Sequence, residues 1–139
     1  MILLDASGLF AFVNGADPHR EAIQRLIDED PGPLILSPYV VAELDYLLST
    51  RIGVQQEAEF LRDVASGAYD LATFDATDIG AATSVIERYR DQNIGLADAS
   101  IVVLAGRYDT NRVLTLDERH FRTLLTPGGE HFTILPADA

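Results

Sequence analysis

Cysteine is absent from this sequence of 139 residues, and so is lysine. Without cysteine the protein cannot form disulfides, use a thiolate nucleophile or build a cysteine-ligated zinc or iron–sulfur site. The absence suits a reducing cytoplasm, which is the location that we expect. Without lysine, all ten basic residues are arginine. The guanidinium group binds phosphate through paired hydrogen bonds, although a GC-rich genome would produce the same bias.

Long hydrophobic segments are missing as well. No uninterrupted apolar run approaches the about 18 residues that a membrane helix needs. The first residues, Met1 to Asp5, lack the basic region of a secretory signal and reach an acidic residue early. We therefore expect a soluble protein without a membrane partner, and the length predicts a single domain over residues 1–139.

Basic residues are outnumbered by 22 acidic residues, which gives a net charge of −12. This balance argues against a nucleic-acid partner, because phosphate binding normally depends on basic patches. The objection weakens if several of the acids are metal ligands, since a bound cation reverses the local field. An acidic chain is also suited to a basic partner protein.

Short apolar runs alternate with longer amphipathic segments along the chain. Helix starts are indicated by Asp17-Pro18, by Ser37-Pro38 and by Asp75 or Thr77, because each offers a capping side chain. Further helices are predicted around residues 60–65, 96–107 and 118–122. The predicted strands lie between these helices, at Met1–Asp5, Leu34–Leu36, Tyr69–Thr73, Arg112–Thr115 and Phe132–Leu135. This alternation predicts a three-layer α/β/α sandwich with a central parallel sheet of four to five strands.

Two acidic residues follow predicted strands directly. Asp5 ends the first apolar run, and Asp117 follows the run from Arg112 to Leu116. In a parallel sheet the carboxyl ends of the strands form the ligand-binding edge. Each aspartate is equally suited to cap a following helix, so neither residue decides the question by itself.

Two other acidic residues fall on the apolar faces of predicted helices. Glu43 lies three residues after Val40, and Asp98 lies three residues before Ile101. These spacings direct the carboxylates toward the interior, where an uncompensated charge costs several kcal/mol. The alternative is a place at the wet margin of each apolar stripe.

Together, Asp5, Glu43, Asp98 and Asp117 can meet at one edge of the sheet. Carboxylates in one site repel each other and raise each other's pKa, and a divalent cation relieves that conflict. Oxygen ligands select a hard ion, Mg²⁺ or Mn²⁺. Such clusters activate a water molecule for displacement at phosphorus, which is the chemistry of a nuclease.

Four segments, in order, resemble the motifs of PIN-domain nucleases. The first is Ile2 to Leu9, the second Ser37 to Leu44, the third Gly95 to Ala99 and the fourth Val113 to Phe121. Their order and spacing resemble VapC-type toxins of bacterial type II toxin–antitoxin systems, over essentially the whole chain. One departure is Ala6, where many relatives have threonine, so a local hydroxyl group is missing.

The resemblance implies an Mg²⁺- or Mn²⁺-dependent endoribonuclease that hydrolyses phosphodiester bonds in structured RNA, with loops of tRNA and ribosomal RNA both represented in the family. Asp5 and Asp98 would be the most direct metal ligands, Glu43 and Asp117 would complete the acidic site, and Ser7 would support the first aspartate. It also implies a homodimer and a small cognate antitoxin protein that silences the enzyme.

Several basic residues flank the fourth motif. Arg112, Arg119 and His120 are candidates for contacts with RNA phosphates. Solvated arginines and a histidine at a helix end are an equally good interpretation.

Two other functions are alternatives for the whole chain. A haloacid dehalogenase-type phosphohydrolase also begins with an aspartate after its first strand, but its signature needs a second aspartate where this chain has Ser7, and a downstream lysine. A catalytically silent PIN-fold interaction module is the non-enzymatic alternative. Four retained acidic residues count against it, because buried carboxylates are costly.

Overall fold

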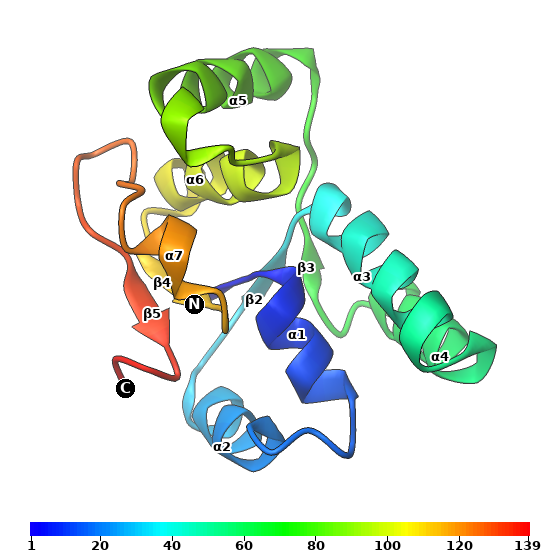
Figure 1. Ribbon diagram of the computed structural model, residues 1–139. Helices are drawn as coiled ribbons and strands as arrows, with labels where there is room; N and C mark the ends of the chain where they lie inside the picture. Colours follow the sequence, from blue (N-terminus) through cyan, green and yellow to red (C-terminus); the bar gives the residue numbers. More distant parts are fainter.

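Five short strands form one parallel sheet at the centre of the computed structural model, which describes residues 1–139 (Figure 1). The spatial order of the strands is β3-β2-β1-β4-β5. All five predicted strands are present, although most are shorter than expected. Their bounds are Ile2–Leu4 (β1), Leu34–Leu36 (β2), Asp70–Leu71 (β3), Arg112–Leu114 (β4) and Thr133–Leu135 (β5).

Helices cover both faces of the sheet, which confirms the predicted three-layer α/β/α architecture. Figure 1 shows α5 and α6 on one side of the sheet and α1 and α2 on the other. This division follows from right-handed crossovers: the chain runs outward from β1 to β3 and then returns past β1 to β4. The helices are Ala6–Val13 (α1), Arg20–Glu29 (α2), Pro38–Arg51 (α3), Val54–Ala65 (α4), Ala76–Arg88 (α5), Leu96–Tyr108 (α6) and Glu118–Phe121 (α7), with a short 3₁₀ turn at Arg90–Gln92.

The predicted helix starts are correct in two of three places. The Ser37 hydroxyl accepts a hydrogen bond from the Tyr39 amide at 3.2 Å, and Asp75 forms a reciprocal capping box with Asp78. The prediction at Asp17 is wrong, because its carboxylate accepts from the His19 amide in a turn that precedes α2.

Helix α1 was not predicted. Its sequence is almost continuously apolar, so it shows no clear 3.6-residue period from which a helix could be recognised.

The sheet is buried on both faces. The three residues of β1 are at most 1% exposed, as expected for a strand of a parallel sheet covered by helices. Strand β1 pairs with β2 on one side and with β4 on the other. The chain builds the sheet in one direction from β1 to β3 and in the opposite direction from β4 to β5, so the strand order reverses between β1 and β4. In open α/β sheets ligands bind at this switch point, beyond the carboxyl ends of the strands.

None of the helices combines the length and the apolar character that crossing a membrane requires.

Candidate active site

Asp5 stands at the switch point, directly after the central strand β1. The residue is 6% exposed, and its side chain makes no capping hydrogen bond to α1. The capping interpretation of Asp5 therefore does not describe this structure. Helix capping therefore does not explain why this carboxylate is buried.

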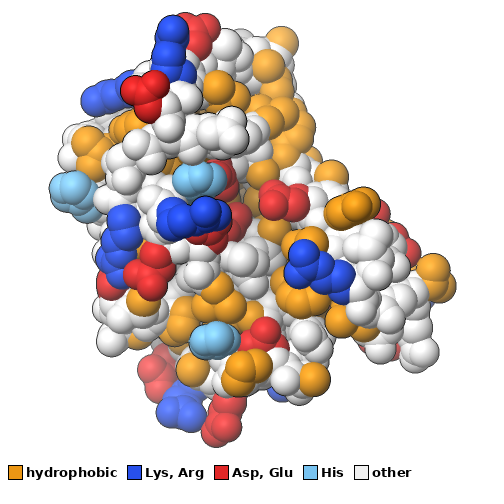
Figure 2. Space-filling view, viewed as in Figure 1, with side chains coloured by type: hydrophobic (Ala, Val, Ile, Leu, Met, Phe, Trp, Pro, Cys, Tyr) orange, Lys and Arg blue, Asp and Glu red, His pale blue; other side chains and the backbone are white.

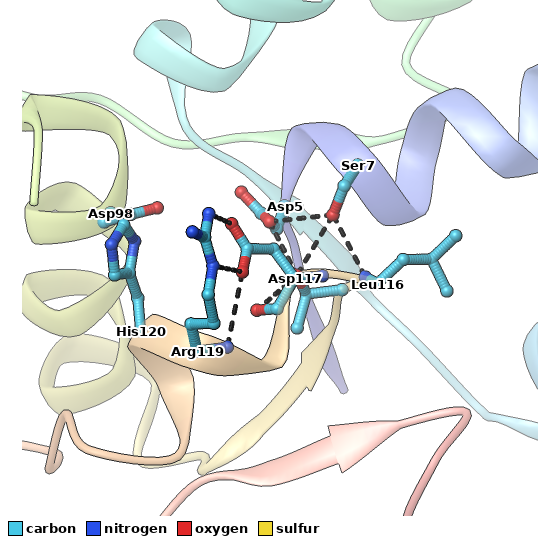
Figure 3. Close-up of polar contacts among 8 residues, drawn as sticks. Asp5, Ser7, Asp98, Leu116, Asp117, Arg119 and His120 are labelled. Atoms are coloured by element: carbon cyan, nitrogen blue, oxygen red, sulfur yellow. Dashed lines mark hydrogen bonds and ion pairs between the residues drawn. The ribbon is translucent and has the colours of Figure 1, made fainter.

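Two hydroxyl groups hold one oxygen of this carboxylate (Figure 3). The Thr115 Oγ1 donates to Asp5 Oδ2 at 2.7 Å, and the Ser7 Oγ donates to the same atom at 3.1 Å. Burial raises the pKa of Asp5, and these two hydrogen bonds offset that effect only in part. The charge of Asp117 raises the pKa further. The protein thus leaves the negative charge of Asp5 incompletely compensated.

Thr115 was not among the predicted site residues. It is 1% exposed, and its hydroxyl also accepts a hydrogen bond from the Asp117 amide at 3.0 Å. The Thr115 hydroxyl therefore connects Asp5, which follows β1, with Asp117, which follows β4. A threonine in an otherwise aliphatic strand end, two residues before an aspartate, was the signal that could have indicated it.

Ser7 has the supporting position that was expected of it. Besides donating to Asp5, its hydroxyl accepts from the Leu116 amide at 3.0 Å. The start of α1 is thereby tied to the segment after β4.

Asp98 lies in the first turn of α6. Its side chain is 18% exposed, and its Oδ2 lies 2.7 Å from the Nδ1 of His120. Burial raises the pKa of Asp98, as does the charge of Asp5, while the hydrogen bond with His120 lowers it. As the apolar spacing predicted, the neighbouring Ile101 is fully packed, at 1% exposed. His120 contacts an acidic side chain here, whereas a phosphate contact had been considered.

Glu43 does not face the interior, and the prediction from its spacing is wrong on this point. The buried stripe of α3 consists of Val40, Leu44 and Leu48, and Glu43 lies exposed beside it. Its pKa is nevertheless raised, first by partial desolvation and then by the charges of Asp5 and Asp98. Glu43 therefore stands at the wet margin of the stripe, near enough to Asp5 and Asp98 for their charges to act on it.

A buried hydrogen bond joins the helices that carry Glu43 and Asp98. The hydroxyls of Ser37, at the start of α3, and Ser100, in α6, are 2.7 Å apart. Both residues are at most 1% exposed. This pair fixes the start of α3 against the first turns of α6.

Asp117 differs from the other three acids. Its carboxylate accepts from the backbone amide of Arg119 at 3.3 Å, which caps α7, and from the Arg119 guanidinium at 3.3 and 3.4 Å. These contacts hold the pKa of Asp117 below its usual range. The capping interpretation of Asp117 is therefore correct, and it coexists with a place beside the other acids.

The chemistry of this donor set fits a hard divalent cation. The ligands would be carboxylate oxygens, and the pKa values of Asp5, Glu43 and Asp98 are raised partly by mutual repulsion, which a cation removes. The carboxylates are not closed around one point, however: no three Asp, Glu or His side chains are near enough to each other to hold one ion. The site would have to contract around the ion, and its side-chain pairs with His120 and Arg119 would have to adjust.

Arg112 lies elsewhere. It begins β4, so it stands at the amino edge of the sheet, and its guanidinium pairs with the buried carboxylate of Asp30. Asp5 and Asp117 follow the carboxyl ends of β1 and β4, whereas Arg112 lies at the amino end of β4. The length of that strand therefore separates Arg112 from the acids. Arg112, a candidate for RNA contacts, is thus placed away from the acids.

The surface over the site carries charges of both signs. Figure 2 shows basic and histidine side chains lying over an acidic surface near the middle of this face. The acids are thus reachable from solvent beside a basic group.

Comparison with known proteins identifies relatives along nearly the whole chain. The PIN domain family model matches residues 2–124. The chain is 47% identical over 135 residues to ribonuclease VapC26 of Mycobacterium tuberculosis (strain ATCC 25618 / H37Rv), covering 97% of this chain and 100% of that protein.

Solved structures share the fold. A crystal structure of Mycobacterium tuberculosis VapC20, described as a sarcin–ricin loop cleaving toxin, matches with a TM-score of 0.77 at 20% identity, over 84% of this chain and 90% of that chain. FitAcB from Neisseria gonorrhoeae matches with a TM-score of 0.62 at 20% identity, over 87% and 91% of the two chains.

Proposed function

The chain belongs to the PIN-domain family and to its VapC ribonuclease toxins, and on this basis we propose that it is an endoribonuclease that depends on Mg²⁺ or Mn²⁺. The observation that supports the proposal is that Asp5, Glu43, Asp98 and Asp117 come from distant segments and yet lie near enough for their charges to act on one another. Three of them, Asp5, Glu43 and Asp98, have raised pKa values, as expected of carboxylates that need a cation.

In the proposed mechanism the four acids have two parts. Asp5 and Asp98 would hold the cation directly, and Glu43 and Asp117 would complete its surroundings. When bound, the cation would supply an activated water and offset the negative charge that develops on the phosphoryl oxygens. Thr115 and Ser7 fix one oxygen of Asp5 by hydrogen bonds, so that the other oxygen stays available. Preorganised charges of this kind need little rearrangement as the reaction proceeds.

The proposed substrate is structured RNA, cut in a loop of tRNA or ribosomal RNA. VapC20, which shares the fold, is described as cleaving the sarcin–ricin loop, and this supports a ribosomal loop as a first candidate. Bases in loops are unstacked, and their backbone is accessible to a protein side chain.

We also propose that the protein acts as a toxin within a toxin–antitoxin pair, that a small antitoxin binds it, and that it forms a homodimer in the cytoplasm. The net charge of −12 favours a partner with a basic segment. Light scattering after size-exclusion chromatography tests the dimer. Co-purification with the product of a neighbouring short reading frame tests the antitoxin.

Mapping the ends of RNA fragments tests the enzymatic function. Purified protein is incubated with total bacterial RNA and Mn²⁺, and new ends are located by sequencing. Discrete ends are expected with the wild type, and Asp98→Asn is expected to reduce their formation about 100-fold or more without lowering the melting temperature. Asp91→Asn, an exposed acid outside the cluster, is the matched control and should cleave normally.

A protein that produces no discrete ends under these conditions would not be the proposed nuclease. Calorimetric titration with Mg²⁺ or Mn²⁺ then tests the silent interaction module, which is expected to bind neither ion. The phosphohydrolase alternative is not retained, because the chain belongs to the PIN-domain family.

A further inference from the structure

Arg119 is the arginine that pairs with an acid of the proposed site. Its Nε lies 3.3 Å from Asp117 Oδ1, and its Nη2 lies 3.4 Å from Asp117 Oδ2. In the view of Figure 3 the guanidinium lies between the Asp117 carboxylate and the pair formed by Asp98 and His120. A positive charge of the protein itself therefore contacts one of the four carboxylates.

This pairing separates Asp117 electrostatically from its neighbours. Arg119 donates to both oxygens of the Asp117 carboxylate, whereas Asp98 pairs with His120 and neither Asp5 nor Glu43 forms a salt bridge with an arginine. Arg119 thus stabilises one carboxylate in the way that a bound cation would stabilise it. A guanidinium and a divalent cation that approach the same two oxygens repel each other, so binding of one weakens binding of the other.

The guanidinium is free to leave without disturbing the fold. The Arg119 side chain is 84% exposed, and its contacts with Asp117 are long for charge-assisted hydrogen bonds. Helix α7 is anchored independently by Phe121, which is 2% exposed and packs edge-on against Phe132 at 5.4 Å. Moving the arginine therefore requires rotation of one solvated side chain.

We propose that Arg119 competes with a divalent cation for Asp117 and, once displaced from that carboxylate, binds a phosphate of the RNA. The inference deepens the proposed nuclease function and rests on it for the second step. Guanidinium recognises phosphate through two parallel hydrogen bonds, the same geometry with which it approaches a carboxylate. One side chain would thereby couple occupation of the acidic site to substrate binding.

The first test measures Mn²⁺ binding by calorimetry in the absence of RNA. Arg119→Gln is expected to bind Mn²⁺ about two- to fivefold more tightly than the wild type, the factor that corresponds to loss of an exposed ion pair. The matched control is Arg122→Gln, which removes the same charge from the end of the same helix. Arg122 pairs with Glu118 and Asp138, outside the site, so this variant should bind Mn²⁺ as the wild type does.

The second test measures KM at saturating Mn²⁺ for a synthetic RNA that spans a mapped cleavage position. Arg119→Gln is expected to raise KM roughly three- to tenfold, as for loss of one ordinary hydrogen bond. The dependence of log KM on log salt concentration is expected to decrease by about one unit, the signature of a lost phosphate contact. Arg122→Gln should change neither quantity.

Opposite changes in the two affinities, tighter for Mn²⁺ and weaker for RNA, support the proposal, since a purely structural arginine would not produce them. Equal or weaker Mn²⁺ binding by Arg119→Gln would overturn the competition, and an unchanged KM would overturn the phosphate contact. If the wild type cleaves no RNA, the proposed function fails and the phosphate contact fails with it, while the calorimetric result still decides the competition.

Discussion

A single hydroxyl group links two of the acids at the centre of the site. Thr115 donates to Asp5 and accepts from the backbone amide of Asp117, so it sets the position of one acid relative to the other. Because Asp5 is buried, each hydrogen bond to its carboxylate offsets part of the cost of holding a charge there. The threonine is therefore expected to affect both stability and chemistry.

Thr115→Val tests this role, because valine has nearly the same shape and no hydroxyl. We expect the free energy of unfolding to fall by about 1 to 3 kcal/mol, since two buried polar groups lose a partner, and we expect cleavage to fall with it. Urea titration and the rate of cleavage of a mapped RNA measure the two effects. A variant with wild-type stability and activity would show that the Ser7 hydroxyl alone suffices to hold Asp5.

At the scale of the elements, the position of α1 depends on close contact with β4. A Cβ atom built on Gly8 would lie 2.6 Å from the carbonyl oxygen of Leu114. No side chain fits there unless the helix moves away from the strand. Because Asp5 and Ser7 stand at the start of α1, such a movement would displace them from Thr115.

Gly8→Ala is therefore expected to destabilise the protein by about 1 to 3 kcal/mol, the usual cost of overpacking, and to reduce cleavage. Gly80→Ala is the matched control, since Gly80 lies in the exposed face of α5 with open space around it. It should stabilise the protein by about 0.5 to 1 kcal/mol, because alanine has the higher helix propensity. Thermal unfolding of both variants measures the difference, and a loss of stability in Gly80→Ala alone would refute this account.

The opposite edge of the sheet is held by Asp30, at the end of α2. Its side chain is 1% exposed and accepts hydrogen bonds from the Gly32 amide at 2.8 Å and from Arg112. Burial by itself would raise the pKa of Asp30, but the hydrogen bonds and positive charges around it prevail and lower it. Arg112 thus ties α2 to the start of β4.

Arg112→Gln is expected to reduce stability by about 1 kcal/mol, since the guanidinium is partly exposed and solvent screens its interaction. Its KM for RNA should equal that of the wild type, because the residue lies away from the acids. Urea titration and steady-state kinetics check the two statements. A raised KM with unchanged stability would restore Arg112 as a contact to the substrate.

For the whole molecule, the excess of negative charge has its main effect at the acidic site, where carboxylates repel each other. Asp5, Glu43 and Asp98 come from three separate segments, and the fold brings them together against their repulsion. A raised pKa means that the charged carboxylate destabilises the folded state relative to the unfolded chain. Without a bound cation, the three charged carboxylates are therefore expected to lower the free energy of unfolding.

This cost determines how stability should depend on pH. Where a carboxyl has a raised pKa in the folded state, the folded protein binds more protons than the unfolded chain between the ordinary value, 3.8 for Asp98, and the raised one. The free energy of unfolding therefore falls as the pH rises through that interval. Asp98→Asn removes the effect, so it should be more stable than the wild type at pH 8, and the difference should vanish on acidification to pH 4.

Mn²⁺ should raise the melting temperature of the wild type at pH 8 and have less effect at pH 5, because the ligands must lose their protons before they bind the ion. Thermal unfolding with and without Mn²⁺ at both pH values measures this dependence. An equal stabilisation of Asp98→Asn would mean that the ion binds elsewhere.

Much of the architecture was determined locally by the sequence. The apolar runs predicted all five strands, and the Ser37 and Asp75 caps predicted two helix starts, because capping and burial act through neighbouring residues and leave a periodic pattern. The four acids were recognised by their places in that pattern and by the order of the family's motifs. Helix α1 was missed, because a helix that is apolar on nearly every side has no period to read.

Tertiary structure decided which of these residues meet. Only the strand order places Asp5 and Thr115 at one switch point. Likewise only packing sets Glu43 at the margin of its stripe. A hydrogen bond or an ion pair across more than a hundred residues depends on how the strands are ordered and the helices packed, and a local pattern of residues carries no record of that order.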